Sequence, residues 1–148
     1  MANAYKRAAD LYKHYIAQID DDIYAIADEI TDDLVDTAKA RCPVESGALM
    51  NSIHKEIKKE ASRVVVDIIA DASNPVTGEC YGDFVEYGTG IHRETGDGRK
   101  DTWSYKDAKG VWHTTKGQAP QPFMRPAIQQ HTARLEKRLQ ALVLEDRR

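Results

Sequence analysis

The sequence predicts an α+β fold, with a long N-terminal helix, a C-terminal helix, a small and mainly antiparallel sheet between them, and an extended loop or hairpin insertion. Three observations predict this class. An aliphatic stripe with helical spacing occupies the first 41 residues, β-branched residues cluster between residues 62 and 72, and a second amphipathic segment closes the chain. A length of 148 residues suits a single domain.

Residues 5–41 are predicted to form a helix, because this stretch contains neither Gly nor Pro. Its aliphatic residues recur at spacings of three and four, as one face of a helix requires. They are Ile16, Ile19, Ile23, Ile26, Ile30 and Leu34. A continuous helix would be about 55 Å long at ~1.5 Å per residue, longer than a domain of this size covers. We expect part of it to project or to pack on a neighbouring subunit, unless the acidic step at residues 20–22 breaks it.

The acidic residues of this helix fall mostly on the face opposite the aliphatic stripe. They are Asp21, Asp22, Asp28, Glu29, Asp32, Asp33 and Asp36. A dense row of carboxylates can hold divalent cations, but this row lacks histidine and a glycine-containing calcium loop. We therefore expect a solvated helix face.

A connector follows the first helix at residues 42–47. Pro43 ends the helix, because a residue that precedes a proline is pushed out of the helical region. A short turn of helix is predicted next, with Glu45 or Ser46 as its cap. Its core-facing residues are expected to be Ala48, Leu49 and Ile53.

Residues 52–60 and 62–72 are predicted to be two strands of a hairpin with its tip at residues 61–62. The second strand is the clearer one because it is rich in β-branched residues. Side chains alternate between the two faces of a strand, and one face of this strand is the better candidate to pack against the core. That face carries Val64, Val66, Ile68 and Ala70.

Residues 81–90 form the central motif of the chain. Phe84, Val85 and Tyr87 make a short apolar group around one acid, Glu86, and two glycines then allow a sharp turn at residues 88–90. We expect a short buried helix or strand that ends in this turn. A buried carboxylate is costly unless it is paired, so Glu86 is predicted to accept backbone N–H hydrogen bonds as a structural latch rather than to act as a catalyst.

Residues 91–117 read as a variable insertion that contains a small hairpin. Strands at 102–106 and 111–115 flank a predicted four-residue turn at 107–110. The hairpin carries Trp103, Tyr105 and Trp112 beside basic residues. These aromatics suit cross-strand pairing, contact with another protein, or stacking on bases or a glycan, and the sequence leaves all three open.

Residues 118–148 begin with a Pro-rich, extended approach and end with a helix. Pro126 is predicted to be the first residue of this helix, which runs to about Leu144, since proline at that position loses no needed N–H. The core-facing stripe is narrower than that of the first helix. It contains Ala127, Ile128, His131, Leu135, Leu139 and Leu142.

Charge is distributed unevenly along the chain, although the formal net charge is only -3. Residues 1–41 carry 5 Lys/Arg against 9 Asp/Glu, residues 42–87 carry 4 against 8, and residues 88–148 carry 12 against 7. An acidic front and a basic back suit head-to-tail contacts between copies, and an evenly solvated surface is the alternative. Two cysteines, Cys42 and Cys80, are too few for a disulfide framework, so a reducing cytosol is expected. No signal peptide or membrane span is expected.

Motifs for enzymatic chemistry are missing, so neither catalytic residues, a metal nor a cofactor is expected. The chain has no glycine-rich phosphate loop, no His-Glu-x-x-His, no Gly-x-Ser-x-Gly and no pair of Cys-x-x-Cys motifs. Cys80 and His92 would supply only two of the four ligands of a structural zinc. A metal-dependent nuclease that uses Asp83 and Glu86, with Lys100 or Lys116 on the phosphate, remains an alternative, as does a nucleic-acid-binding loop.

Three separated blocks resemble a family of small tailed-bacteriophage proteins of siphophage type, called neck, tail-completion or head–tail joining proteins. Residues 42–53, CPVESGALMNSI, resemble that family's A-P-x-x-[ST]-G-x-L-x-x-S-I segment, with Cys42 where alanine is usual. Residues 84–89, FVEYGT, are similar to its hydrophobic-[VI]-E-[FY]-G-T block. Residues 121–127, QPFMRPA, are similar to its Q-P-F-[LM]-x-P-A block, and the three occur in the same order.

The resemblance implies helices packed on a small antiparallel sheet, and a structural virion protein without enzymatic activity. It implies a ring, expected to be a hexamer, that joins the DNA-filled head to the tail, with a tail terminator or head stopper as the alternative. Its expected partners are further copies, neighbouring head-completion and tail proteins, and DNA that passes through the lumen without sequence-specific binding. Assembly is expected in the bacterial host cytoplasm and the final location in the virion neck or tail end.

The residues matched by the three blocks are expected to hold the fold, and two other groups are expected to make protein contacts. The structural group is Pro43, Gly47, Leu49, Glu86, Gly88, Thr89, Pro122, Phe123 and Pro126. The candidate interface residues are Trp103, Tyr105, Trp112, Ile16 and Ile19.

Overall fold

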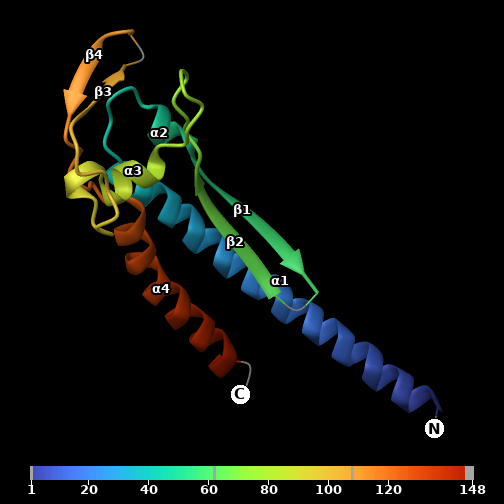
Figure 1. Cartoon of the computed structure of the whole chain (residues 1–148). Helices are drawn as coiled ribbons and strands as arrows, with labels where there is room; N and C mark the ends of the chain where they lie inside the picture. The colour runs from blue at the N-terminus through green and yellow to red at the C-terminus, as the bar shows by residue number, and fades with distance from the viewer. Residues whose placement is uncertain (1, 62, 108, 146–148) are drawn as a thin grey trace.

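The computed structural model describes residues 2–61, 63–107 and 109–145, and its described side chains in the first helix begin at residue 10 and omit residues 12 and 15. The element order is α1 (Ala2–Arg41), α2 (Ala48–Ser52), β1 (Ile53–Glu60), β2 (Arg63–Ala70), α3 (Gly82–Tyr87), a 3-10 turn (Gly90–His92), β3 (Trp103–Lys106), β4 (Trp112–Thr115) and α4 (Met124–Glu145). The predicted α+β class is confirmed. Hairpin β1–β2 and helix α4 lie along α1, and hairpin β3–β4 stands at the far end (Figure 1).

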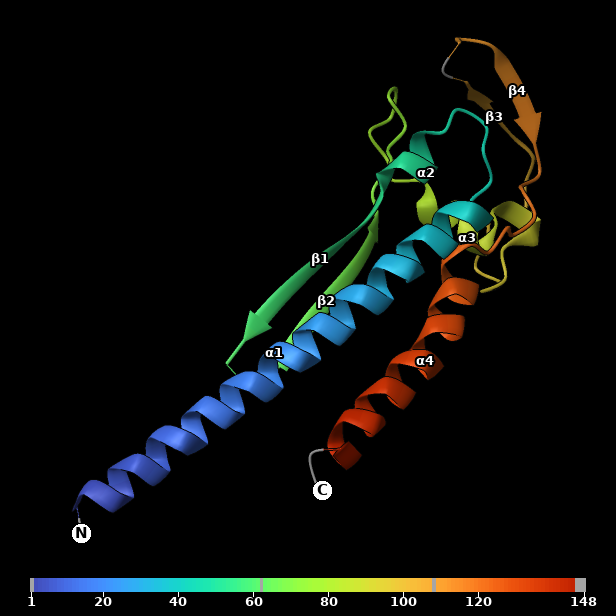
Figure 2. The same cartoon turned by 180° about the vertical axis from the view of Figure 1, so that it is seen from behind.

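Helix α1 is continuous over 40 residues, so the acidic step at residues 20–22 does not break it. At ~1.5 Å per residue the helix is about 60 Å long. Its N-terminal part extends past the tip of hairpin β1–β2 and past the end of α4 (Figure 2). Leu11 is 70% exposed and Ile16 is 47% exposed. The predicted projection of this helix is therefore present.

Hairpin β1–β2 is antiparallel and pairs Ile53 with Ala70 at one end and Glu60 with Arg63 at the other. Both strands are shorter than predicted, because residue 52 belongs to α2 and residues 71–72 leave the sheet. Ser62, expected at the hairpin tip, lies outside the described residues. Ile68 and Ala70 pack against the core, which confirms the predicted inner face of β2.

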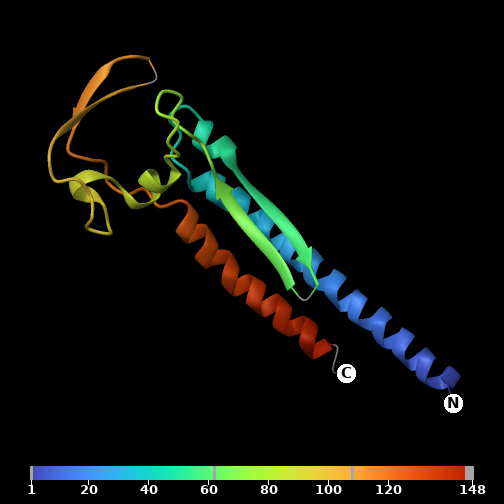
Figure 3. The same cartoon turned by 45° about the vertical axis from the view of Figure 1, so that its right-hand side comes forward.

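The hydrophobic core lies at the C-terminal end of α1, where α2, the start of β1 and the start of α4 meet. Phe123 and Ile53 are each 1% exposed, and Ala38 and Ala127 are fully buried. The complete cluster is Leu34, Val35, Ala38, Cys42, Leu49, Ile53, Ala72, Phe123 and Ala127. The core thus occupies one end of an elongated molecule, far from the projecting half of α1 (Figure 3).

Three residues expected in the core are exposed instead. Ala48 is exposed, since Leu49 and Ile53 take the inner side of the short α2 segment. Ile128 is 41% exposed because Ala127 and His131, four residues apart, form the face of α4 that contacts α1. Phe84 is 40% exposed, because α3 turns Glu86 inward and a residue two positions away then points outward.

The caps of the helices also differ from prediction. The residue before α2 is Gly47 rather than Glu45 or Ser46, with a left-handed φ of 78°. Ser46 Oγ still accepts a hydrogen bond from the Ala48 N–H at 3.3 Å. Helix α4 begins two residues before Pro126, at Met124, because a carboxylate from α3 binds its first N–H groups, as described below.

The acidic face of α1 is largely exposed, as predicted, and it also pairs with cations of neighbouring elements. From β1, Lys55 Nζ contacts Asp28 Oδ1 at 2.6 Å and Asp32 Oδ1 at 2.8 Å. Two arginines of α4 reach the same helix from its other flank. These contacts are Arg134 with Asp33 and Glu29, and Arg138 with Glu29. Cations from both covering elements therefore flank the acidic row, a long-range pairing that helical periodicity does not reveal.

Hairpin β3–β4 is present as predicted, but its turn spans the five residues 107–111 rather than four, because Lys106 pairs with Trp112. Within that turn, residue 108 lies outside the described part of the chain. The two tryptophans do not face each other, since Trp103 pairs with Thr115. The aromatic cross-strand pair is Tyr105 with His113, whose ring centroids lie 5.3 Å apart in a stacked arrangement.

Candidate functional site

Glu86 connects α3 to the start of α4. The helical repeat of α3 turns its side chain inward, where it is 5% exposed. Oε2 accepts hydrogen bonds from the backbone N–H of Phe123 at 2.8 Å and of Met124 at 2.9 Å. Oε1 accepts from the backbone N–H of Arg125 at 3.0 Å. Glu86 therefore satisfies three N–H groups at the helix N-terminus that have no partner within α4.

The same carboxylate pairs with the Arg125 side chain, whose Nε donates to Oε1 at 2.8 Å. Burial of Glu86 opposes ionisation, but the N–H of Met124, the Arg125 guanidinium and the backbone N–H groups of Arg125 and Phe123 together hold the pKa of Glu86 below its usual value. The carboxylate is therefore held as an anion at neutral pH.

Arg125 links this latch to the loop after α3. Its Nη1 contacts Glu94 Oε2 at 2.8 Å, and its Cζ lies 4.5 Å from the centroid of the Tyr87 ring. Hydrogen bonds to Glu94, which has the larger effect, and to Glu86 raise the pKa of Arg125. Arg125 occupies the unspecified position of the third sequence block, so no pattern in the sequence predicted its role.

The turn after α3 crosses a second segment of backbone very closely. Thr89 N–H donates to the Gln118 carbonyl oxygen at 2.9 Å, and Thr89 Oγ1 accepts from the Gln118 N–H at 2.9 Å. Gly88 has a φ of 77° and Gly90 a φ of 59°, as the predicted sharp turn requires. A Cβ on Gly90 would overlap the carbonyl group of Lys116. The turn and the Pro-rich approach to α4 are therefore locked together.

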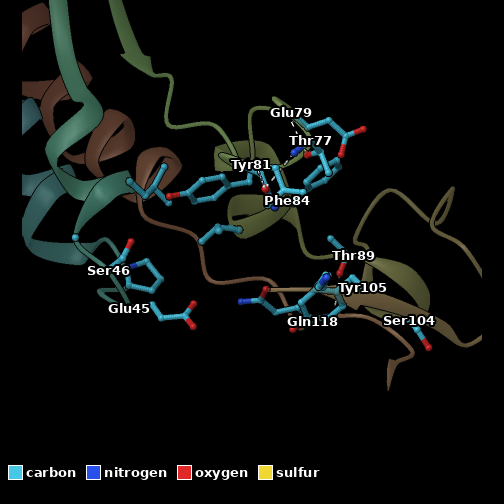
Figure 4. Close-up of a pocket in the computed structure, with 17 residues that line it drawn as sticks. Glu45, Ser46, Thr77, Glu79, Tyr81, Phe84, Thr89, Ser104, Tyr105 and Gln118 are labelled. Atoms are coloured by element: carbon cyan, nitrogen blue, oxygen red, sulfur yellow. Dashed lines mark hydrogen bonds between the residues drawn. The ribbon is translucent and has the colours of Figure 1, made fainter. Parts of the chain in front are cut away.

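An open groove of about 600 Å³ lies beside this latch. Its walls come from the connector after α1, the loop before α3, helix α3 itself and hairpin β3–β4. Figure 4 shows Glu45 and Ser46 on one wall, Tyr81 and Phe84 on another, and Tyr105 on the hairpin side. Four of the residues predicted as structural line it: Pro43, Gly47, Leu49 and Thr89.

The structural group predicted from the sequence comes together around the groove and the latch. Phe123 enters the core between two prolines, of which Pro122 is exposed and Pro126 half-buried. The candidate interface residues lie at opposite ends of the molecule. Tyr105 and Trp112 are 47% and 69% exposed on the distal hairpin, with Trp103 half-buried beside Arg99. Ile16 and Ile19 lie on the projecting part of α1.

The residues weighed for metal chemistry are engaged in other contacts. Glu86 is occupied by the α4 terminus, and Asp83 Oδ2 contacts Arg93 Nη2 at 3.0 Å. Cys80 Sγ lies 3.5 Å from the carbonyl oxygen of Ala70. Within the described residues, no group of three or more His, Cys, Asp or Glu side chains is arranged to hold a metal ion.

Among the helices in the described ranges, none combines the length and the apolar character that crossing a bilayer requires.

Comparison with known proteins places the chain in a family. Residues 7–88 match the family model HK97-gp10_like, described as "Bacteriophage HK97-gp10, putative tail-component". The match runs from α1 to the turn after α3, so it contains the first sequence block and all of the second except Thr89, and it ends before the third. Neither the curated proteins nor the solved structures contain a significant match. The resemblance to phage neck and tail-completion proteins is thereby confirmed at family level, and the chain belongs to the HK97-gp10-like family of bacteriophage tail components.

Proposed function

We propose that this tail component forms a ring at the head–tail junction, where it completes the tail and joins it to the DNA-filled head. The observation that carries the proposal is the uncovered half of α1. Asp21 contacts Lys59 of β1 at 2.5 Å, and from there the helix continues toward its N-terminus past the tip of the hairpin (Figure 1). Residues 2–20 measure about 28 Å at ~1.5 Å per residue. A helix in a protein gains most of its stability from packing of its apolar face, so a partner that covers this segment would stabilise it.

The two ends of the molecule differ in chemistry, which supports a ring. One end carries the apolar stripe of α1, and the other carries the groove and the exposed aromatics of hairpin β3–β4. Closed rings are built from heterologous contacts, in which one patch meets a different patch on the next copy. We propose a hexamer with DNA passing through its lumen, and a net charge of -3 gives the protein no excess of positive charge with which to grip the phosphates.

We also propose that the chain folds as a single domain. In support, the core draws Leu34 and Ala38 from α1 and Phe123 and Ala127 from the C-terminal region. Calorimetric unfolding tests this point, and one transition with equal calorimetric and van't Hoff enthalpies is expected. Two resolved transitions would contradict it.

The ring proposal is tested by the mass of the purified protein in solution and by negative-stain images after mixing with tail tubes or DNA-filled heads. We expect a ring, or binding to the end of a tube. Binding only to the portal vertex of filled heads would instead indicate a head stopper, and termination of tubes without head attachment would indicate a tail terminator. A monomer that ignores both particles would contradict the proposal.

A nucleic-acid-binding or nuclease function has weaker support, because the candidate metal ligands Glu86 and Asp83 are already paired. In the basic insertion, Arg93 is paired with Asp97 at 3.0 Å. Salt-dependent DNA binding, or metal-dependent cleavage lost in Glu86→Gln, would favour this function over the ring.

A further inference from the structure

We infer that the projecting segment of α1, residues 10–19, docks into the groove of the next copy. This arm–groove contact rests on the proposed ring and specifies which two surfaces meet in it. The arm lies at one end of the molecule, and α2, α3 and hairpin β3–β4, which contribute to the lining of the groove, lie at the other end (Figures 1–3). A copy therefore does not reach its own groove with its own arm.

The arm offers apolar side chains in helical register. Ile16 is 47% exposed, and Ile19, three residues later on the same stripe, is half-buried. Farther along α1, this stripe continues into Ile30 and Leu34, which the chain buries itself at 1% and 7% exposure. The arm thus carries the exposed continuation of the apolar stripe that the rest of the chain buries farther along α1.

The walls of the groove are partly apolar, and its volume suits the side chains of a bound helix. Leu49 lies at its floor, and Val76, Phe84 and Tyr105 stand on its sides with 65%, 40% and 47% of their surfaces exposed. A volume of about 600 Å³ accommodates several side chains of an amphipathic helix. Insertion of Ile16 and Ile19 would bury apolar surface on both copies at once.

The charges of the groove favour the arm over a purely apolar partner, because the arm carries a lysine that can pair with the carboxylates of the groove. Two carboxylates, Glu45 and Glu79, line the groove, and neither forms an ion pair within the described part of the chain. Lys106 is the groove's cation, and its Nζ lies 6.0 Å from the Trp112 ring. On the arm, Lys13 lies one turn before Ile16 and is exposed. Docking would bring this lysine to the acidic groove.

Cross-linking of full-length protein tests the contact directly. Two samples are mixed, one with Ile16→Cys and one with Val76→Cys, both in a Cys80→Ser background that removes the exposed native thiol. A short bis-maleimide should join the two proteins into a mixed dimer. Gln18→Cys replaces Ile16→Cys as the matched control, because Gln18 is also exposed but lies on the opposite face of the helix.

Charge substitutions test the same contact without a reagent. Ile16→Lys should weaken self-association by about tenfold or more, as expected when a buried anchor is lost, whereas Gln18→Lys, on the opposite face, should leave it unchanged. Lys13→Glu and Glu79→Lys should each weaken association. A protein that carries both exchanges should recover part of the loss, because the pair is then restored with reversed sign.

The outcomes separate this inference from the ring itself. Rings that form in Ile16→Lys, together with no cross-link between cysteines at positions 16 and 76, would overturn the arm–groove contact and leave the ring standing. Cross-linked open chains that do not bind tail tubes would support the contact and overturn the ring. Absence of both cross-links and self-association would overturn both, and so would a groove that captures only proteins other than this chain.

Discussion

The carboxylate of Glu86 accepts a hydrogen bond from the backbone N–H of Phe123 at 2.8 Å, across 37 residues of sequence. This contact joins two of the three sequence blocks. It places the end of the central motif against the first turn of α4, and it positions Phe123 in the core with 1% of its surface exposed. The latch thereby fixes one wall of the groove relative to the helix that packs along α1.

Glu86→Gln is expected to reduce the free energy of unfolding by about 2–4 kcal/mol, because a neutral amide keeps only one acceptor oxygen. Either the N–H groups of Phe123 and Met124 or the N–H and guanidinium of Arg125 then lose their acceptor. Urea denaturation at pH 7 measures this change. Glu94→Gln is the matched control, since Glu94 contacts the same arginine but is exposed. That control should cost no more than about 1 kcal/mol. Equal losses in the two variants would show that the ion pair, not the helix cap, provides the stability.

The stabilisation by Glu86 is expected to disappear in acid. Its pKa in the folded protein lies below the ordinary value of 4.5, so the folded state binds this proton less tightly than the unfolded state does. Its contribution is therefore complete above pH 4.5 and is lost as the pH falls through the folded pKa. The difference in unfolding free energy between wild type and Glu86→Gln should shrink below that pH. A constant difference from pH 7 to pH 3 would contradict the assignment.

Gly90→Ala is expected to destabilise the fold by about 3 kcal/mol or more. A left-handed conformation costs an L-residue about 1–2 kcal/mol, and here the added Cβ would also overlap the Lys116 backbone. Gly96→Ala is the matched control, with a φ of 77° but open space around the new Cβ. It should cost only about 1 kcal/mol. Thermal unfolding of both variants measures the difference, and similar melting temperatures would argue against the close backbone crossing.

Elements with strong local periodicity were predictable from the sequence. The aliphatic spacing of α1, the β-branched run of β2 and the turn residues of hairpin β3–β4 each specify their element through neighbours in the chain. Contacts between distant segments were not predictable in this way. The pairing of Lys55 with Asp28 spans 27 residues, and nothing in either segment marks the other as its partner.

The site was predicted in part for the same reason. A buried acid beside a glycine turn must find donors, so a latch at Glu86 followed from the cost of an unpaired charge. That its donors belong to α4 depends on tertiary packing. For Phe84 the sequence prediction was wrong. An aromatic residue in an apolar group was expected to be buried, but Glu86 points into the protein from the same short helix and Phe84 therefore lines the groove.

The imidazole of His131 provides a final prediction, because it is buried between α4 and α1 with only one of its nitrogens paired. Thr37 Oγ1 donates its proton to the Asp33 carbonyl oxygen at 2.8 Å, so the 2.8 Å contact with His131 Nε2 requires that nitrogen to be the donor. Nδ1 is then a buried acceptor without a partner among the described residues.

His131→Leu should therefore change the free energy of unfolding by less than about 1 kcal/mol, since it removes one hydrogen bond together with an unsatisfied buried acceptor and keeps most of the volume. His131→Ala should cost about 2 kcal/mol or more, because it leaves a cavity beside Thr37 where α4 packs on α1. Urea denaturation of the two variants compares these effects. A leucine variant as unstable as the alanine variant would mean that the Thr37 hydrogen bond, rather than packing volume, holds the two helices together at this point.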